Sequence, residues 1–233
     1  MKKLSNTHQK LLCYLVVFLM FILMGNSNNN PTVFIDRIFK PLQGSNWAFY
    51  YAAILVVIGL YYSLKQLHKL SGSSLIKIPP RRIIAILILL NVFSSMWDYS
   101  IQIYKGFYHD LNTIYLNREK TSIELEGNEE TLNINGVIDF KNCGFTTQTF
   151  YVQITAPALI KELVNEDYFI LEKEITIDPR SGKTIYLNEE VKLDKDDQST
   201  RFGAYAFEYI IFNDQDEAIF KGNLMDYLGD SLD

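Results

Sequence analysis

Three long apolar runs occupy the first hundred residues, and beyond residue 118 apolar residues alternate with polar ones instead. The runs cover residues 11–24, 47–64 and 83–103. A helix needs about 20 residues, at a rise of about 1.5 Å each, to cross about 30 Å of hydrocarbon. We therefore predict a transmembrane domain over residues 1–106, with three transmembrane helices at about 8–25, 47–64 and 83–104.

The first run leaves an alternative open. It is fourteen strictly apolar residues long and follows a basic N-terminus, and Gly25-Asn26-Ser27 loosely resembles a small-x-small cleavage site. A secretory signal peptide has the same shape. We interpret the run as an uncleaved membrane anchor, with cleavage as the alternative.

The second half of the chain has the period of β-strands. Residues 121–126, 131–141 and 147–155 alternate apolar with polar positions, and further extended segments follow at 168–177, 183–193, 203–212 and 217–224. A helical or irregular piece is expected near 159–165, and the last two segments flank a turn and predict a hairpin. About seven short strands with regular turns predict an all-β, immunoglobulin-like sandwich over residues 119–226, followed by a tail at 227–233.

Two stretches of this region resemble small bacterial extracytoplasmic immunoglobulin-like domains. In that family a strand pair joined by an Asn/Gly turn, here Asn142-Cys143-Gly144 within residues 135–157, is followed by a Pro-containing turn, here within residues 178–193. The resemblance covers less than half of the domain. It implies a fold, attached here to a small multi-span membrane anchor, and it implies no particular activity.

Charge divides the chain in the same place and predicts its orientation. Residues 1–106 carry eleven basic residues and two acids, whereas residues 107–233 carry eleven basic residues and twenty-five acids. The loop at 64–82 holds five basic residues and no acid, so it is predicted to be cytoplasmic. The N-terminus is then also cytoplasmic and the acidic domain extracytoplasmic. Such acidity makes nucleic acid a poor partner.

The residues that common enzymes need are mostly missing from the second half. The chain has three histidines, His8, His68 and His109, and all precede the predicted sandwich. A Ser-His-Asp or Cys-His site would lack its base, and the two cysteines are too few for a structural zinc site. We predict no enzyme and no cofactor. Two acidic groups could bind calcium, although we interpret them as solvated turns without the Gly and terminal Glu of an EF-hand: Asp194, Asp196 and Asp197, and Asp214 and Asp216.

Asp98 lies near the end of the third apolar run. It follows Ile83 by fifteen residues, or about 22 Å of helix, which places it near the outer membrane surface rather than at the centre. Asn91 and Asp98 belong to a polar stripe whose outer part, Lys105 included, is expected to be solvated. Arg37 or Lys40 of the outer loop could form an ion pair with Asp98.

An apolar stripe continues past the third run at steps of four and three. It predicts that the helix extends to about residue 117, so that residues 107–118 form a helical stalk with a seam for packing on protein. The seam consists of Trp97, Ile101, Tyr104, Tyr108, Leu111 and Tyr115.

These features predict a multi-pass cell-membrane protein whose extracytoplasmic domain acts by binding, as a non-catalytic accessory or interaction subunit of an envelope complex. Its partners would be membrane lipid and either another envelope protein or a second copy of itself. Low cysteine content with abundant Lys, Asn and Ile is typical of a bacterial protein. Two alternatives are an envelope sensor of calcium or a cationic peptide, and a transporter component that uses the polar stripe.

Overall fold

The chain forms two compact units. The computed structural model describes residues 5–43, 48–72, 77–127, 131–155, 168–171, 173–192, 201–203 and 207–222. The helical unit consists of residues 1–27 and 32–99, and the β unit of residues 28–31 and 100–233. The predicted helical piece at 159–165 and the tail at 227–233 lie outside the described residues. The chain therefore passes between the two units at three places, not at the single place that the sequence predicts.

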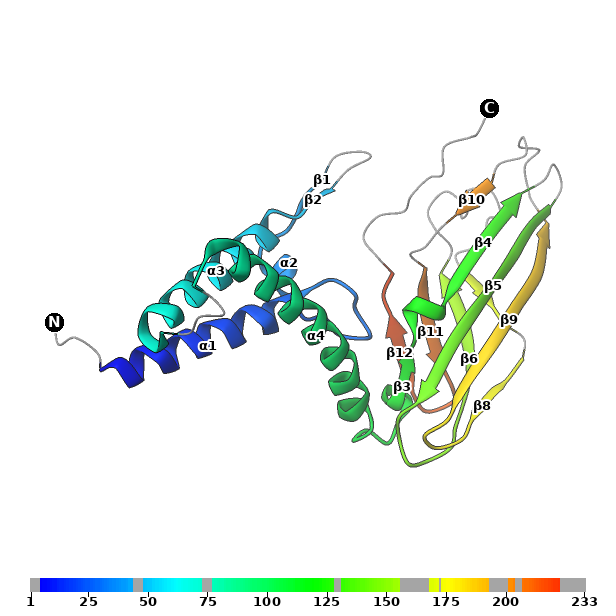
Figure 1. Ribbon diagram of the computed structural model, residues 1–233. Coiled ribbons are helices and arrows are strands. Elements are labelled where there is room, and N and C mark those ends of the chain that lie inside the picture. The colour runs from blue at the N-terminus through cyan, green and yellow to red at the C-terminus, as the bar shows by residue number, and fades with distance from the viewer. Residues whose placement is uncertain are drawn as a thin grey trace. The chain divides into compact units, whose positions relative to one another are not determined.

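Four helices and a small hairpin make up the helical part of the chain (Figure 1). They are α1 (Asn6–Met24), α2 (Phe34–Ile38), β1 (Leu42–Gln43), β2 (Ala48–Phe49), α3 (Tyr51–Ser71) and α4 (Pro79–Lys105), of which the last six residues belong to the β unit. The Ser5 side chain caps α1 by accepting a hydrogen bond from the His8 N–H. Gly72 ends α3 in the left-handed region, at a φ of 69°.

Two of these helices, α1 and α4, are long and apolar enough to cross a membrane. The remaining predicted span corresponds to α3. Among the described helices, α3 does not meet this criterion of length and hydropathy. Helix α3 begins at Tyr51, four residues later than predicted, and continues to Ser71. It therefore takes in polar residues that the prediction placed in the following loop, among them Lys65 and Lys69.

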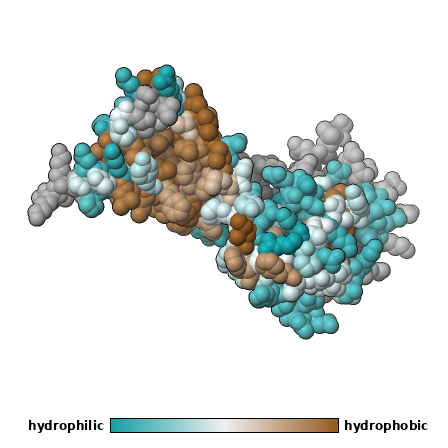
Figure 2. Space-filling model, turned by 60° about the horizontal axis from the view of Figure 1, so that its bottom comes forward, coloured by the Kyte–Doolittle hydropathy of each residue, from teal (hydrophilic) through white to brown (hydrophobic). Residues whose placement is uncertain are grey.

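Helices α1 and α3 pack on each other along one face. The buried positions of α3 recur about every four residues, as the period of an α-helix requires: Ala52, Val56, Leu60, Leu64 and Leu67. Phe21 of α1 and Ile86 of α4 belong to the same cluster. Most other large apolar side chains of these helices point outward, and hydrophobic residues cover the face of the helical unit that Figure 2 shows.

The β unit consists of two antiparallel five-stranded sheets. In the first, the long strand β5 (Thr131–Asn142) pairs along one edge with β3 (Ile114–Leu116) and β4 (Ser122–Gly127), and along the other with β9 (Gly182–Lys192). Strand β10 (Arg201–Gly203) pairs with β4. In the second sheet, β6 (Gln148–Thr155) pairs with β7 (Tyr168–Ile170), β8 (Ile175–Ile177) and β11 (Glu208–Phe212), and β12 (Glu217–Phe220) pairs with β11.

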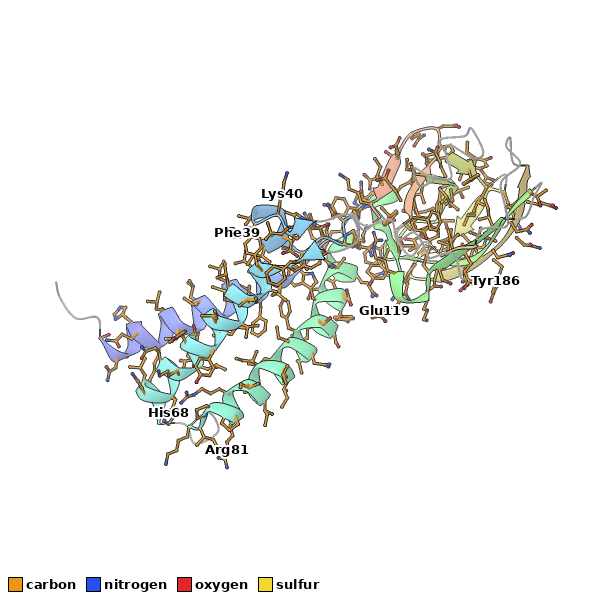
Figure 3. All side chains as sticks on the ribbon, turned by 90° about the horizontal axis from the view of Figure 1, so that it is seen from above. Phe39, Lys40, His68, Arg81, Glu119 and Tyr186 are labelled. Atoms are coloured by element: carbon orange, nitrogen blue, oxygen red, sulfur yellow. The ribbon has the colours of Figure 1, made fainter. Side chains whose placement is uncertain are left out.

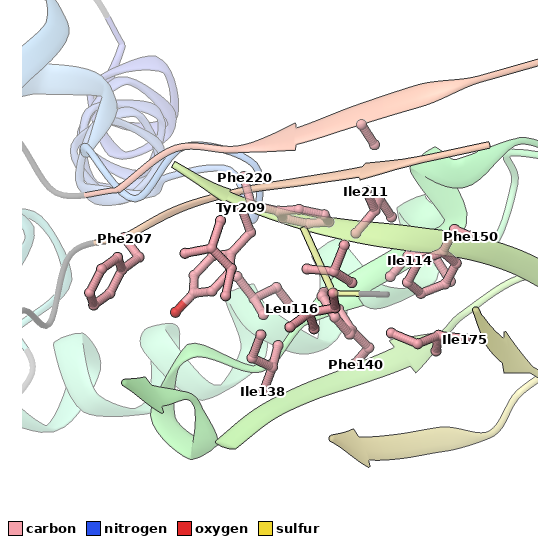
Figure 4. Packing of buried hydrophobic residues seen from close by; sticks show 14 of the residues in the cluster. Ile114, Leu116, Ile138, Phe140, Phe150, Ile175, Phe207, Tyr209, Ile211 and Phe220 are labelled. Carbon is pink, nitrogen blue, oxygen red and sulfur yellow. The ribbon is translucent and has the colours of Figure 1, made fainter. Parts of the chain in front are cut away.

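One hydrophobic core lies between the two sheets (Figure 4). Strand β6 alternates buried and half-buried residues along its whole length, with Phe150, Val152 and Ile154 facing inward. Phe140 of β5 contacts Phe150 edge to face, with ring centroids 5.6 Å apart, and contacts Phe220 of β12 at 6.2 Å. The period-two pattern therefore predicts this core correctly.

The strand predictions are confirmed in position, with two subdivisions. The predicted segment 168–177 is two strands, β7 and β8, that share one edge of β6. In the described part of the segment 203–212, the strand residues are β11 and the last residue of β10. Strands β11 and β12 form the expected antiparallel hairpin.

The predicted helical stalk at 107–118 is wrong. Helix α4 ends at Lys105, and the N–H of Gly106, the next residue, donates hydrogen bonds to the carbonyls of Gln102 and Ile103. A side chain at Gly106 would come within 2.9 Å of the Cys143 carbonyl oxygen, so the chain turns tightly against the β unit there. Residues 111–116 are a 3₁₀ turn and strand β3, so the β domain begins before the predicted residue 119.

Candidate functional site

A cluster of hydrogen-bonded polar groups surrounds residues 28 and 29 within the β unit. Asn28 follows helix α1 by four residues, and its side chain, 7% exposed, forms two hydrogen bonds with the backbone of Leu116. Its Nδ2 donates to the Leu116 carbonyl at 2.8 Å, and its Oδ1 accepts from the Leu116 N–H at 2.9 Å. Because β3 pairs with β5 on its other edge, Asn28 satisfies the open edge of β3 as another strand would.

Asn29 does the same for the edge strand of the other sheet. Its backbone carbonyl accepts from the Lys221 N–H at 2.8 Å, and its Nδ2 donates to the Ile219 carbonyl at 3.0 Å. Strand β12, which contains Ile219, pairs with β11 on its other side. Residues 28 and 29 therefore join β3 of the first sheet to β12 of the second. We call Asn28, Asn29, Lys105 and Arg118 the Asn junction.

Lys105 is buried at the centre of the Asn junction, with only 4% of its side chain exposed. Its Nζ donates to Asn29 Oδ1 at 2.8 Å, to the Ile114 carbonyl at 2.8 Å and to the Asn112 carbonyl at 3.1 Å. It also lies 5.3 Å from the centre of the Phe220 ring. The three oxygens match the three protons of an ammonium group, so this buried cation is fully hydrogen-bonded.

Arg118 closes the Asn junction from the other side. Its guanidinium donates to the Asn28 carbonyl at 3.1 Å and to the Lys221 carbonyl at 2.8 Å, so it links residue 28 to the residue that follows β12. Burial lowers the pKa of Arg118 and raises the pKa of nearby Tyr209. Tyr209 keeps its proton at neutral pH, because this shift moves its pKa further from neutrality.

Burial also lowers the pKa of Lys105, to about 8. This residue follows the predicted span 83–104 and contacts only groups of the β unit. Burial raises the pKa of Cys143, which disfavours the reactive thiolate. All three ammonium protons of Lys105 are donated to oxygens, and the Cys143 thiol keeps its proton. These two groups therefore suit a structural role better than nucleophilic catalysis.

The predicted apolar seam does not form one surface. Trp97 lies in the helical unit, where its Nε1 donates to the Asn26 carbonyl at 2.8 Å. Tyr104 and Tyr108 share a hydroxyl hydrogen bond of 2.6 Å, whereas Leu111 is buried in the core of the β unit. Ile101 remains on α4 and Tyr115 lies on β3. The regular spacing arose from a helix, a turn and a strand in succession.

The intramembrane polar residues and the proposed ion pair are placed as follows. Asn91 is exposed on α4 and Asp98 is half-buried on the same helix. Arg37 donates to the Thr32 carbonyl at 3.0 Å and lies 4.8 Å from the centre of the Phe34 ring. The Lys40 side chain is exposed and points away from the helices (Figure 3). An ion pair of Asp98 with Arg37 or Lys40 stays a prediction.

The candidate calcium ligands divide between described and undescribed residues. Asp194, Asp196 and Asp197 lie outside the described residues. Asp214 and Asp216 lie in the turn between β11 and β12, which Asn213 organises by accepting the N–H groups of Gln215 and Asp216 on its side-chain oxygen. Within the described part of the chain, no three His, Cys, Asp or Glu residues are grouped so that they could hold a metal ion.

Sequence reasoning missed the Asn junction and assigned Lys105 wrongly to a solvated face. The polar run Asn28-Asn29-Asn30 between two helical segments was the available signal, since unbroken amide side chains are suited to pairing with exposed backbone. Comparison of the chain with protein families, with curated proteins and with solved structures finds no match.

Proposed function

We propose that this chain is a multi-pass membrane protein with three spans and one extracytoplasmic immunoglobulin-like domain, which acts by binding as a non-catalytic accessory or interaction subunit of an envelope complex. The observation that carries the proposal is the contrast between the two surfaces. Leu11, Phe18 and Leu87, on α1 and α4, are more than half exposed, whereas hydrophilic residues cover most of the β unit in Figure 2. Apolar surface of this extent on helices suits a lipid environment.

Helix α3 is the proposed third span. Its 21 residues reach about 32 Å, and the hydrocarbon core is about 30 Å thick. While one face packs on α1, its opposite face exposes Ile54, Leu55 and Ile58. The basic residues near its C-terminal end, together with Arg81 and Arg82, favour a cytoplasmic position for the loop that follows.

The β unit supports the binding role in two ways. Its two antiparallel sheets around a single core are the architecture of immunoglobulin-like domains, which commonly present edges and loops to partners. Two of its buried polar residues, Lys105 and Asn28, bond to the backbone of β3 and so stabilise the fold. Such an arrangement favours a stable surface over a reaction site.

A topology and partner experiment tests the proposal. The full chain carrying a C-terminal affinity tag is expressed in bacterial membranes, and the tag should be cleaved by protease added to spheroplasts but not to inside-out vesicles. Single cysteines at Ser71 and Glu119, in a chain with Cys13→Ala, should react with impermeant reagents from the cytoplasmic and outer side respectively. Recovery of the chain in the soluble fraction, or the reverse labelling, would contradict the proposal.

The binding role is tested by purification in mild detergent from the native membrane. A stoichiometric partner should co-purify with the full chain and be lost when exposed residues of the β unit are substituted. The same chain with Ser71→Ala, which alters the proposed cytoplasmic end of α3, serves as the matched control and should retain the partner. Recovery of a bare monomer under several gentle conditions would contradict a role as an interaction subunit.

A sensor is the second candidate, because the Asn junction holds Asn28, Asn29 and the end of α4 in the β unit, and both segments continue along the chain into the helical unit. A ligand that altered the β unit would thereby act on two separate segments of the chain. The full chain in detergent should then show a rise in melting temperature with calcium or a cationic peptide. An unchanged melting temperature with both ligands would remove this candidate.

A further inference from the structure

Strand β9 has a long outer edge in the first sheet. Among the described residues its eleven-residue backbone pairs with β5 alone, through an unbroken register from Gly182 to Lys192. Tyr186, at its middle, is 80% exposed and lies on the outside of the β unit (Figure 3). Edge strands of this length normally need protection, since their unpaired N–H and C=O groups can accept another strand.

The sequence of β9 is self-complementary about Tyr186. In an antiparallel pair of two β9 strands centred on this residue, Lys183 of one strand lies opposite Glu189 of the other, and this pair occurs twice. Ile185 lies opposite Leu187, and both point toward the core side, where Leu187 is buried and Ile185 packs against the core. Thr184 lies opposite Asn188, and the two Tyr186 side chains meet at the twofold axis.

Other registers lack this match. Centring the pair on Leu187 places Ile185 opposite Glu189, and centring it on Ile185 places Lys183 opposite Leu187. Charged residues on the core side of an edge strand usually repel a foreign strand, because pairing would leave them without a partner. In β9 the spacing of Lys183 and Glu189 about Tyr186 allows one specific partner, a second copy of this strand, to pair both charges. Lys183 donates one proton to the Thr176 carbonyl at 3.0 Å and has two more for such a pair.

We propose that two copies of this chain associate by antiparallel pairing of their β9 strands, in register about Tyr186. This inference rests on the proposed function, in which the β unit acts by binding, and it names a second copy as a partner. Anchoring in a shared membrane raises the effective concentration of the two strands, so a contact of one strand pair is sufficient. The continuous sheet that results removes the exposed edge.

Cysteine crosslinking of the full chain in membranes tests the register. All variants carry Cys13→Ala, and the parent, in which only buried Cys143 remains, is the blank. Tyr186→Cys should give a disulfide-linked dimer, because directly opposite residues have Cα atoms about 5 Å apart and disulfides span about 4.4 to 6.8 Å. Asn188→Cys alone should not, since its two copies would be offset by about 13 Å along the strands.

A mixture of chains with Asn188→Cys and Thr184→Cys should again crosslink, because these positions lie opposite each other only in this register. The proposal is overturned if Tyr186→Cys stays monomeric under oxidation, or if Asn188→Cys alone crosslinks as readily as Tyr186→Cys. The second outcome would indicate chance collisions of an exposed strand.

Charge reversal supplies an independent measurement. Lys183→Glu and Glu189→Lys should each lower the yield of the Tyr186→Cys dimer about fivefold, because each creates two like-charge pairs. The two reversals combined should restore the yield. Lys173→Glu, an equal change at an exposed position outside β9, should leave it unchanged. If the dimer yield stayed low when both charges were reversed together, the proposed register would be overturned.

The two proposals fail in distinguishable ways. A chain with the expected topology that co-purifies a partner but shows no Tyr186→Cys dimer leaves the proposed function standing and overturns the β9 dimer. A chain recovered as a soluble protein overturns the proposed membrane role whatever the crosslinking shows.

Discussion

The helical unit and the β unit arrange their apolar side chains in opposite ways. In the β unit Phe140, Phe150 and Phe220 are completely buried, and the positions between buried ones carry mostly polar residues. In the helical unit Phe18 and Leu87 are more than 60% exposed, although one face of each helix is packed. Water can stabilise the β unit by the hydrophobic effect, whereas the helical unit needs an apolar medium around it.

Buried polar groups are incompletely hydrogen-bonded in both units, so they can be compared group by group. Lys105 in the β unit donates to three oxygens. Asp36 of α2, in the helical unit, is 7% exposed, and its Oδ1 has no hydrogen-bond partner in the described part of the chain. In the β unit, Thr113 Oγ1 and Arg118 Nε likewise have no hydrogen-bond partner in the described part of the chain, so of these groups only Lys105 is fully hydrogen-bonded.

Two native residues report separately on the units. Cys143 is 2% exposed in the β unit, so its reaction with a thiol reagent in a Cys13→Ala chain measures opening of that unit. Trp97 lies in the helical unit and packs on Phe34 and Phe93, so its fluorescence in a Trp47→Phe chain measures the packing there. Both substitutions form the parent chain for the following predictions.

The largest expected effect contrasts Phe140→Ala with Leu87→Ala. Phe140→Ala should lower the stability of the β unit by about 3 to 5 kcal/mol, since it removes a ring from a closed core. Leu87→Ala, at a 62% exposed position, should cost less than about 1 kcal/mol in lipid, where it loses contacts with acyl chains only. Rates of Cys143 labelling and Trp97 denaturation midpoints give the two values. Equal losses would break the contrast between the units.

If Phe140→Ala prevents folding, Ile138→Val gives the same test at a smaller amplitude. Ile138 is completely buried, and loss of one methylene should cost about 0.5 to 1.5 kcal/mol. Tyr186→Phe, at an exposed position of the same sheet, is the matched control and should leave the stability of the β unit unchanged.

Local periodicity accounts for what the sequence could predict. The four-residue spacing in α3 and the alternation in β6 are repeated many times within a short segment, so each element could be located without knowledge of its neighbours. The end of α4 could not be located in this way. The apolar spacing continues by coincidence through Leu111, which is buried from a 3₁₀ turn, and Tyr115, which lies on a strand.

The Asn junction lies beyond such patterns because its partners are far apart in sequence. Asn28 bonds to Leu116, 88 residues away, and Asn29 bonds to Ile219, 190 residues away. Neither pairing leaves a local period, and Lys105 was assigned to solvent because Lys is rarely buried without a fixed set of acceptors. That set exists only once both sheet edges have formed.

The second prediction concerns Asn28→Ala. The substitution leaves the N–H and the carbonyl of Leu116 without their partner at a buried edge, which should cost about 2 to 4 kcal/mol. Cys143 labelling should accelerate accordingly. Asn188→Ala, at an exposed position of β9, is the control and should change the rate less than twofold. An unchanged rate for Asn28→Ala would show that the edge of β3 does not need the Asn junction.

Gly25→Ala should destabilise the helical unit, by somewhat less than Asn28→Ala destabilises the β unit. A Cβ at this position would lie 2.4 Å from the Trp97 ring, so the ring must shift away from the turn after α1. Overpacking of this kind costs about 1 to 3 kcal/mol. The Trp97 emission should shift, and the rate of Cys143 labelling should not. Gly72→Ala is the control at the end of α3, where the φ of 69° strains alanine but no atom of the described residues lies within 4 Å of the added Cβ. It should leave Trp97 emission unaltered.

The buried ammonium of Lys105 predicts a pH dependence of the β unit. The folded pKa is lowered from 10.5 to about 8, so between these values the unfolded chain holds a proton that the folded chain has released. Stability should therefore rise with pH by roughly 1 kcal/mol between about pH 8 and about pH 9. Above the ordinary pKa of Cys143, 9.0, the raised pKa of that buried thiol opposes the rise. Above the ordinary pKa of Tyr209, near 10, the raised pKa of that phenol reverses the trend.

Urea midpoints from circular dichroism across this range measure the effect. Lys105→Met should flatten the rise, because no group then titrates in the Asn junction, whereas Lys173→Met at an exposed position should preserve it. A rise that persists in Lys105→Met would assign the pH dependence to another group.

The smallest effect is expected for Asp36→Asn, and it sharpens the comparison of buried polar groups. Burial raises the pKa of Asp36 above its ordinary 3.8, so the folded chain binds a proton more readily than the unfolded chain. The stabilisation from this proton is complete below pH 3.8 and is lost as pH rises through the folded pKa. Asp36→Asn, which is neutral throughout, should remove that dependence and stay within about 1 kcal/mol of the parent at neutral pH.

Denaturation midpoints from Trp97 fluorescence between about pH 4 and about pH 7 measure the loss of this dependence. Asp178→Asn, an exposed change in the β unit, is the control for altered net charge and should leave the Trp97 midpoints unchanged. If Asp36→Asn instead destabilised the helical unit by more than about 2 kcal/mol, the carboxylate would have a strong charged partner. The two units would then satisfy their buried charges alike, and the contrast would be confined to their apolar surfaces.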